Sequence, residues 1–265
     1  MNPASRMPVV FVGHGSPMNA IDDNLWSHGW STLGRELPRP EAILSVSAHW
    51  YTPGTYLTGQ DQPPTIHDFG GFPRALFEVE YPARGHVDLA GRVAGMLADR
   101  RASLRSDWGL DHGTWSVLRH LRPAADVPVI QLSIDRRLPP AEHVAIGRAL
   151  APLRDQGVMI LASGNVTHNL RHAMRHLGDD RVETPPWAAS FDTDVSRALV
   201  QHDHDFLTRA LDSDVGRAAH PSPDHYLPLL YAAGAADRDD AVGFPVAGFD
   251  AGSLSMRSVR FDRGE

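Results

Sequence analysis

The sequence contains no cysteine, and this absence excludes disulfide bonds and thiolate metal ligands. It has no apolar run long enough to span a membrane, and residues 1–7 do not resemble a signal peptide. No basic run is longer than Arg100-Arg101 or Arg136-Arg137, and the net charge is -7. We therefore expect a cytoplasmic protein with no membrane or nucleic-acid partner.

Several catalytic signatures are missing as well. The chain has no His-Glu-x-x-His sequence and no Walker loop, which excludes the metalloprotease and phosphate-binding sites that these motifs form. The segment Gly13-His14-Gly15-Ser16 does not match the Gly-x-Ser-x-Gly turn of hydrolases and does not continue as a dinucleotide-binding fingerprint. Internal repeats, linkers and low-complexity segments are also absent, so we expect a single domain over residues 1–265.

Histidine, by contrast, is abundant, with 15 residues. Three apolar, strand-like runs, 9–12, 42–48 and 158–165, lead to His14, His49 and His168. Because ligands bind at the carboxyl ends of strands in open α/β sheets, this repeated placement predicts one shared site.

Two further histidines lie at the starts of predicted helices. His112 opens a helix that runs to about Leu121, where Asp111 could orient the imidazole or cap the helix. His225 is expected in the first turn of the last apolar helix, where a neutral, ligating imidazole suits the helix dipole.

His14, His49 and His225 could therefore converge on one metal ion. Three protein ligands leave coordination positions open, as in catalytic sites, and an all-imidazole site suits zinc or iron(II). His168 and His112 are then candidates for a fourth ligand, a proton-transfer group or a substrate hydrogen-bond donor.

The segment 62–73 is rich in proline, glycine and aromatic residues and is expected to form an ordered loop. Its residues His67, Phe69 and Phe72 could wall a pocket for a flat aromatic ligand. The alternative interpretation, a packed surface loop, fits the composition equally well.

The alternation of strands and helices predicts an α/β fold, with a central, largely parallel or mixed sheet flanked by helices and the metal site at the carboxyl ends of the strands.

Asp22 or Asp23 is expected to cap a helix over residues 24–37, with Leu25 on its apolar face. Six further histidines are expected in solvent: His143, His172, His176, His202, His204 and His220. Further helices are expected at 87–100, 140–155, 187–201 and 204–211, further strands at 102–105, 127–134, 244–249 and 255–261, a hairpin arm at 51–58 and a turn-rich segment at 178–186.

Six short motifs are distributed over nearly the full length of the sequence. They are Gly13-His14-Gly15-Ser16-Pro17-Met18, Ser47-Ala48-His49-Trp50, the segment 64–73, Asp111-His112-Gly113, the segment 163–169 and Pro223-Asp224-His225-Tyr226-Leu227-Pro228. With these motifs the chain resembles the 4,5-DOPA dioxygenase extradiol family, which belongs with the catalytic subunit of protocatechuate 4,5-dioxygenase to the class III extradiol dioxygenases.

The resemblance implies a metal held by His14, His49 and His225, with His168 as a fourth ligand or an acid/base. The protocatechuate enzyme holds iron(II) with two histidines and a glutamate, whereas His225 takes the place of the carboxylate here. The site then carries one negative charge less, which favours zinc as the resting metal. Because zinc has no redox chemistry, iron(II) is the metal expected for activity with dioxygen.

The activity implied is the opening of a catechol ring by dioxygen beside the diol, with L-DOPA or a related catechol as substrate. By the same resemblance, His168 removes and returns a proton, and His112 forms a hydrogen bond to the substrate oxygen or to dioxygen. His67, Phe69 and Phe72 cover the ring. Two other interpretations remain, a zinc hydrolase that activates water at the same histidines and a metal-binding relative without catalysis. The sequence implies no particular oligomeric state.

Overall fold

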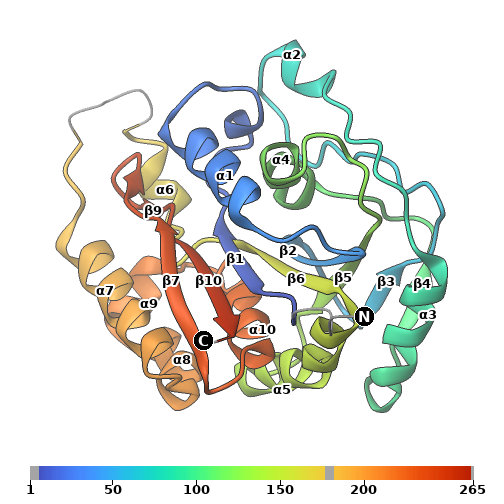
Figure 1. The fold of residues 1–265 in the computed structure, drawn as a ribbon. Helices are drawn as coiled ribbons and strands as arrows, with labels where there is room; N and C mark the ends of the chain where they lie inside the picture. Colours follow the sequence, from blue (N-terminus) through green and yellow to red (C-terminus); the bar gives the residue numbers. More distant parts are fainter. Residues whose placement is uncertain (1–5, 177–181, 264–265) are drawn as a thin grey trace.

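A mixed sheet of eight strands forms the centre of the computed structural model, which describes residues 6–176 and 182–263. The strand order is β4-β3-β5-β2-β6-β1-β10-β7. The four middle strands, β5, β2, β6 and β1, run parallel, whereas β10 and β7 continue the sheet in the antiparallel sense. The α/β fold with a largely parallel, mixed sheet is thereby confirmed (Figure 1).

The elements have the following bounds. The strands are β1 (Val9–Gly13), β2 (Ala42–Thr52), β3 (Tyr56–Thr58), β4 (Ser103–Arg105), β5 (Val129–Asp135), β6 (Val158–Gly164), β7 (Asp240–Val246), β8 (Phe249–Asp250), β9 (Leu254–Ser255) and β10 (Ser258–Arg263). The α-helices are α1 (Leu25–Glu36), α2 (Arg74–Phe77), α3 (Val87–Met96), α4 (His112–Leu121), α5 (Pro140–Leu150), α6 (Leu170–Ala173), α7 (Pro186–Val200), α8 (His204–Arg209), α9 (Asp214–Ala219) and α10 (Leu227–Ala235). Short 3-10 helices are η1 (Pro17–Ala20), η2 (Ala98–Arg100), η3 (Ala151–Gln156) and η4 (Ala210–Asp212).

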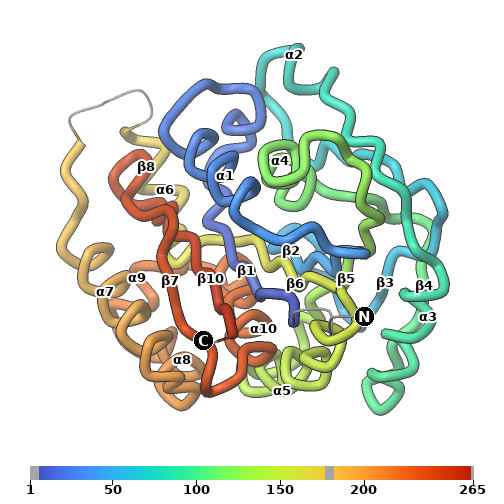
Figure 2. The backbone as a smooth tube through the Cα atoms, in the orientation of Figure 1, coloured from blue at the N-terminus to red at the C-terminus, as the bar shows by residue number. Residues whose placement is uncertain are grey.

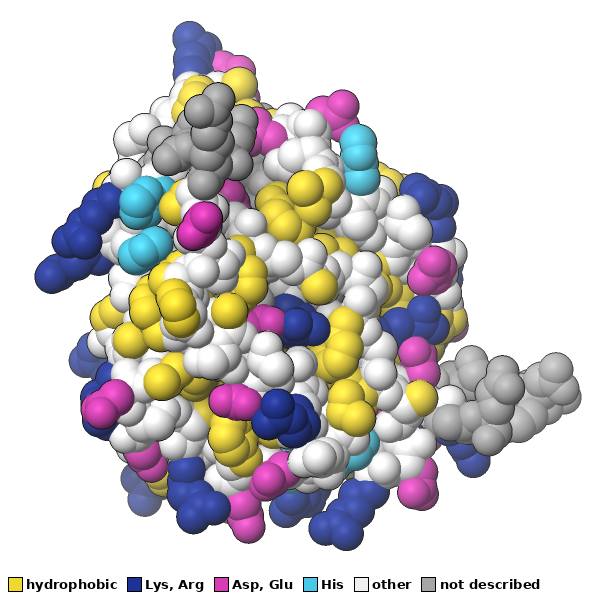
Figure 3. Space-filling model, turned by 90° about the vertical axis from the view of Figure 1, so that its left-hand side faces the viewer, with side chains coloured by type: hydrophobic (Ala, Val, Ile, Leu, Met, Phe, Trp, Pro, Cys, Tyr) yellow, Lys and Arg dark blue, Asp and Glu magenta, His cyan; other side chains and the backbone are white. Residues whose placement is uncertain are grey.

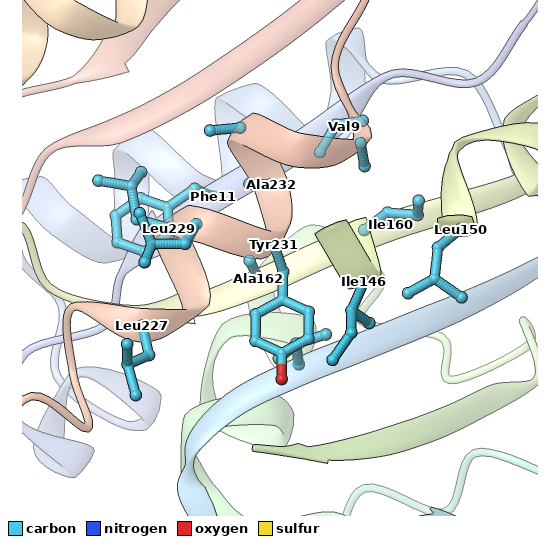
Figure 4. Close-up of a cluster of buried hydrophobic side chains, with 14 of the residues drawn as sticks. Val9, Phe11, Ile146, Leu150, Ile160, Ala162, Leu227, Leu229, Tyr231 and Ala232 are labelled. Atoms are coloured by element: carbon cyan, nitrogen blue, oxygen red, sulfur yellow. The ribbon is translucent and has the colours of Figure 1, made fainter. Parts of the chain in front are cut away.

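Helices cover both faces of the sheet, because successive side chains of a strand point to opposite sides. Val9 and Phe11 of β1 pack into the core beneath α5 and α10, together with Tyr231 and Ile146 (Figure 4). Val10 and Val12 pack into the other core, which α1 and α4 cover. This double burial explains why β1 and the first five residues of β6 read as continuous apolar runs in the sequence.

The face formed by α7, α8 and β7 carries apolar side chains interspersed with charged ones (Figure 3). The small β8–β9 ribbon lies beside α6, where His168 forms a bridge to Leu254 (Figure 2). No helix in the described part of the chain is long and apolar enough to cross a membrane.

The first helix is capped by Asn24, not by Asp22 or Asp23 as expected. The Asn24 side chain accepts hydrogen bonds from the backbone N–H groups of Trp26 and Ser27, and the Ser27 side chain completes a capping box. Leu25 is 63% exposed, because it occupies the first helical position outside the buried stripe.

The hairpin expected over residues 51–58 is wrong. Tyr51 and Thr52 belong to β2, and β3 pairs with β5 and β4 instead. The helix expected over residues 140–155 changes at Leu150 to the 3-10 helix η3, in which Pro152 lacks the N–H that an α-helix needs. The helix expected over residues 87–100 likewise ends at Met96. Both closing strands form, but β7 begins at Asp240 and β10 at Ser258.

Two histidines expected in solvent are buried. The ring of His143 is fully buried, and its Nδ1 lies 2.9 Å from the hydroxyl of Tyr231. The ring of His220 donates to the carbonyl of Val166 at 2.8 Å and packs against the rings of Phe191 and Tyr226. Because charged neighbours in the sequence do not reveal which way a ring points, the polar context of both residues was misleading. His172, His176, His202 and His204 are only partly exposed, and the turn-rich segment 178–186 lies partly outside the described residues.

Candidate metal centre

Three imidazole rings meet at the carboxyl ends of the parallel strands. His14 follows β1, and His49 lies in β2 between Val46 and Tyr51, where the register with β5 shifts. Such an irregularity turns a side chain away from its regular direction. His225 comes two residues before α10, rather than in its first turn as expected. The ring centroids of His14, His49 and His225 lie 5.1, 5.2 and 5.1 Å apart.

This spacing suits three imidazoles on one tetrahedral ion. At metal–nitrogen distances of about 2.0–2.1 Å, two such ligands place their nitrogens about 3.3 Å apart and their ring centres about 5 Å apart. The Nε2 atoms of His14 and His49 are 3.2 Å apart.

Hydrogen bonds at Nδ1 assign the tautomers of these rings. His14 Nδ1 lies 2.9 Å from the Oγ of Ser163, whose hydroxyl donates to the carbonyl of Gly113 and so accepts from the ring. His49 Nδ1 lies 3.1 Å from a carboxylate oxygen of Asp68, and His225 Nδ1 contacts Asp224. Each Nε2 is then left with a lone pair, as metal-ligating histidines require. Two lone pairs that face each other repel unless a cation lies between them, so the residues fit a bound metal.

Burial, hydrogen bonds and neighbouring charges together set the charge of each group in the site. Burial lowers the pKa of His14 and of His225 well below the ordinary value, and the neighbouring histidines lower both further. Burial also disfavours charge on His49, but its hydrogen bond to Asp68 and the charge of Asp111 raise its pKa overall. Burial alone would raise the pKa of Asp68, yet the hydrogen bonds from His112 and His49 hold it well below its usual range. The carboxylate therefore stays ionised and favours a cation nearby.

Two more histidines lie against this trio. The ring of His168 lies parallel to His225, with centroids 3.5 Å apart. The ring of His112 lies 3.8 Å from that of His49. Among the described residues, it is the donor atoms of His14, His49 and His112 that lie within 4.8 Å of one another. However, 3.8 Å is too short for two rings on one tetrahedral ion, which places His112 beside the trio rather than within it.

The aromatic loop, residues 62–79, borders the site next to His112. The ring of Phe69 lies 5.4 Å from His112, and Phe72 packs edge-on against Phe69 at 5.4 Å. The Nε2 of His67 instead lies 3.0 Å from the carbonyl of Val79, so this ring links two parts of the loop. Phe69 is thus the member of the expected aromatic wall that contacts a site histidine.

The sequence reasoning missed the groups that orient the histidines: Ser163, Asp68 and Asp224. A signal was present, because Asp68 follows His67 within a quoted motif and Asp224 directly precedes His225. Carboxylates commonly accept the second ring N–H of a metal-bound histidine.

Fold and site together define an α/β protein with a cluster of largely buried histidines that could hold a metal ion. The family model described as the catalytic LigB subunit of aromatic ring-opening dioxygenase matches residues 8–254. The chain therefore belongs to this family, and the dioxygenase class expected from the sequence motifs is confirmed.

Named relatives and a solved structure agree with this assignment. A protein of Escherichia coli (strain K12) named 4,5-DOPA dioxygenase extradiol is 50% identical over 264 residues, covering 97% of this chain and 95% of that protein. A Beta vulgaris protein of the same name is 36% identical over 258 residues, covering 95% of each chain. The crystal structure of an uncharacterized Escherichia coli K12 protein superposes with a TM-score of 0.84 at 44% identity, covering 98% of this chain and 100% of that one.

Proposed function

We propose that this chain is an extradiol dioxygenase that opens the ring of a catechol, L-DOPA or a close relative of it, at an iron(II) ion held by His14, His49 and His225. The observation that carries the proposal is the equal spacing of these three rings, at 5.1–5.2 Å, with every Nδ1 engaged elsewhere. The names of the relatives support the choice of substrate.

When bound, iron(II) supplies the electron transfer that activates dioxygen, whereas zinc(II) would fill the same site without redox chemistry. The three imidazoles would hold the ion as neutral ligands on one side and would leave its other side open to the substrate. His14 and His225 are 1% and 7% exposed, so bulk water has little access to these two rings.

His168 is the proposed acid/base. Burial lowers its pKa to about 3, so the ring is neutral at physiological pH and can accept a proton. Its stacking on His225 holds it beside the metal position, within reach of a substrate hydroxyl. A negatively charged substrate would raise its basicity, and the ring can then return the proton to the product.

His112 and the aromatic loop are proposed to hold the substrate. Because Asp68 accepts the N–H at Nδ1 of His112, the Nε2 of this neutral ring carries a lone pair and could accept a hydrogen bond from a catechol hydroxyl. Phe69 and Phe72 are proposed to contact the face and edge of the catechol ring, and His67 to support them by closing the loop.

The test is reconstitution of the metal-free protein under anaerobic conditions with iron(II) or with zinc(II). L-DOPA and air are then added while oxygen uptake and yellow product are followed, with His49→Ala as the control that should take up no oxygen. We expect stoichiometric uptake with iron only. Zinc-dependent turnover without oxygen uptake would identify a hydrolase, and inactivity with both metals across several catechols would refute the proposal.

A further inference from the structure

One carboxylate joins two imidazoles of the site. The Oδ1 of Asp68 accepts from the backbone N–H of His112 at 2.9 Å and from the Nδ1 of the same residue at 3.0 Å. The Oδ2 lies 3.1 Å from the Nδ1 of His49, and this contact raises the pKa of the ring as a hydrogen bond to a carboxylate does. The Asp68 side chain is 15% exposed, so water cannot readily take over these three bonds.

We propose that Asp68 is a positioning residue that fixes the donor tautomer of His49 and thereby couples the aromatic loop to the metal centre. The inference rests on the metal centre of the proposed function and not on its catechol substrate. Asp68 itself does not reach the metal. It acts through His49, whose Nε2 faces the Nε2 of His14.

The coupling follows from where Asp68 sits. It lies between His67, which is bonded to Val79, and Phe69, which contacts His112. The same loop is fixed to α4 by Ile66, whose carbonyl accepts from the Nε1 of Trp115 at 2.8 Å. A loop held in this way delivers its carboxylate to β2 and α4 at once. We therefore expect loop order and metal occupancy to depend on each other.

Replacement of Asp68 by asparagine gives a specific outcome. The amide oxygen should stay on the side of His112, where two N–H groups donate to it. The amide NH₂ then faces the Nδ1 of His49 and requires this nitrogen to accept. His49 would consequently carry its proton on Nε2, which points at His14 and occupies the place of the metal.

The experiment is a cobalt(II) titration of the metal-free protein, followed by its visible absorption. For Asp68→Asn we expect cobalt affinity about 10–100-fold below that of the wild type. For Asp68→Ala we expect a smaller loss, since an alanine forces neither tautomer. The matched control is Asp23→Asn, which alters an exposed aspartate paired with His28 away from the site and should leave affinity unchanged.

This order of effects separates positioning from packing. A carboxylate that only filled space would make Asp68→Ala the more harmful change, and that result would overturn the proposal. Wild-type affinity in Asp68→Asn would overturn it too. If a wild type that binds cobalt tightly shows no activity with catechols, the proposed substrate is refuted, whereas the Asp68 proposal is judged by the affinities alone.

Hydrogen exchange of the wild-type protein gives a second measurement should the variants fail to fold. Zinc should slow exchange of the His112 amide, which donates to Asp68, and of the amides of residues 65–72. Unchanged exchange of these amides on zinc binding would contradict the coupling between loop and metal. A wild type that binds neither metal would overturn the metal centre itself.

Discussion

The imidazole of His168 lies flat against that of His225, with centroids 3.5 Å apart and an angle of 3° between the planes. His168 reaches this position from the loop after β6, where its backbone N–H donates to the carbonyl of Ala219 and the residue bridges to Leu254. A proposed metal ligand and a proposed proton carrier thus share one stack.

Replacing His168 by phenylalanine tests these roles, since a phenyl ring keeps the stack but carries no proton. We expect the turnover number for oxygen uptake to fall by about 10²-fold or more, with metal content unchanged. His176→Phe changes a partly buried histidine eight residues further along the chain, and this variant should behave as the wild type. Joint loss of metal and activity in His168→Phe would instead identify His168 as a ligand.

The choice between His225 and His112 as third ligand can be made by metal analysis. We expect His225→Ala to lose the metal, because it removes one of three evenly spaced rings. His112→Ala should retain the metal and lose activity, because its ring lies too close to His49 to share a tetrahedral ion with it. Circular dichroism checks that both fold. The opposite pattern of metal content would reverse the assignment.

Gly113 provides a steric test of how closely the site is packed. A Cβ at this position would lie 2.4 Å from the Oγ of Ser47 and 3.0 Å from the Cδ2 of His49. We expect Gly113→Ala to lower the free energy of unfolding by about 1–3 kcal/mol and to weaken cobalt binding through displacement of His49.

Gly91, in the exposed part of α3, is the matched control for this substitution. A Cβ there meets nothing within 4 Å, and alanine favours a helix by about 1 kcal/mol over glycine. Gly91→Ala should therefore stabilise the protein in urea unfolding without changing cobalt affinity. If Gly113→Ala were equally harmless, the close packing of α4 against His49 would be disproved.

His143 predicts a loss of stability in acid. Burial lowers its pKa to about 4, against an ordinary value of 6.5, so between these values the unfolded chain binds more protons than the folded one. Its contribution is fully present above pH 6.5 and is lost as the pH falls towards 4, to a total of about 3 kcal/mol.

His143→Gln removes this titration and retains a hydrogen-bond partner for Tyr231. Urea unfolding of this variant is measured between about pH 4.5 and 7.5, a range that covers most of this window and extends above it. The free energy of unfolding of the variant should depend less steeply on pH than that of the wild type. His28→Gln, at an exposed histidine, serves as the control for the substitution itself. Parallel profiles for His143→Gln and wild type would show that His143 does not titrate in this range.

Local patterns in the sequence were enough for the central strands and the main helices. The apolar run before His14 becomes β1, because a strand buried on both faces is largely apolar, and the run before His49 becomes β2 although Ser45 and Ser47 interrupt it. The placement of histidines at strand ends predicted a shared site for a different reason, since the carboxyl ends of parallel strands lie at one edge of the sheet. The family motifs added the likeness to extradiol dioxygenases.

The tertiary structure alone decided which side chains become partners. Asp68 contacts His49, which is 19 residues away in the chain, and His112, which is 44 residues away. The periodicity of a helix or strand predicts no contact over such separations. The pairing of β3 with β5 and the burial of His143 against Tyr231 are of the same kind. Sequence patterns record whether a position faces the core, because burial has a local period. Hydrogen-bond partners depend on the packing of distant segments, which leaves no such period in the sequence.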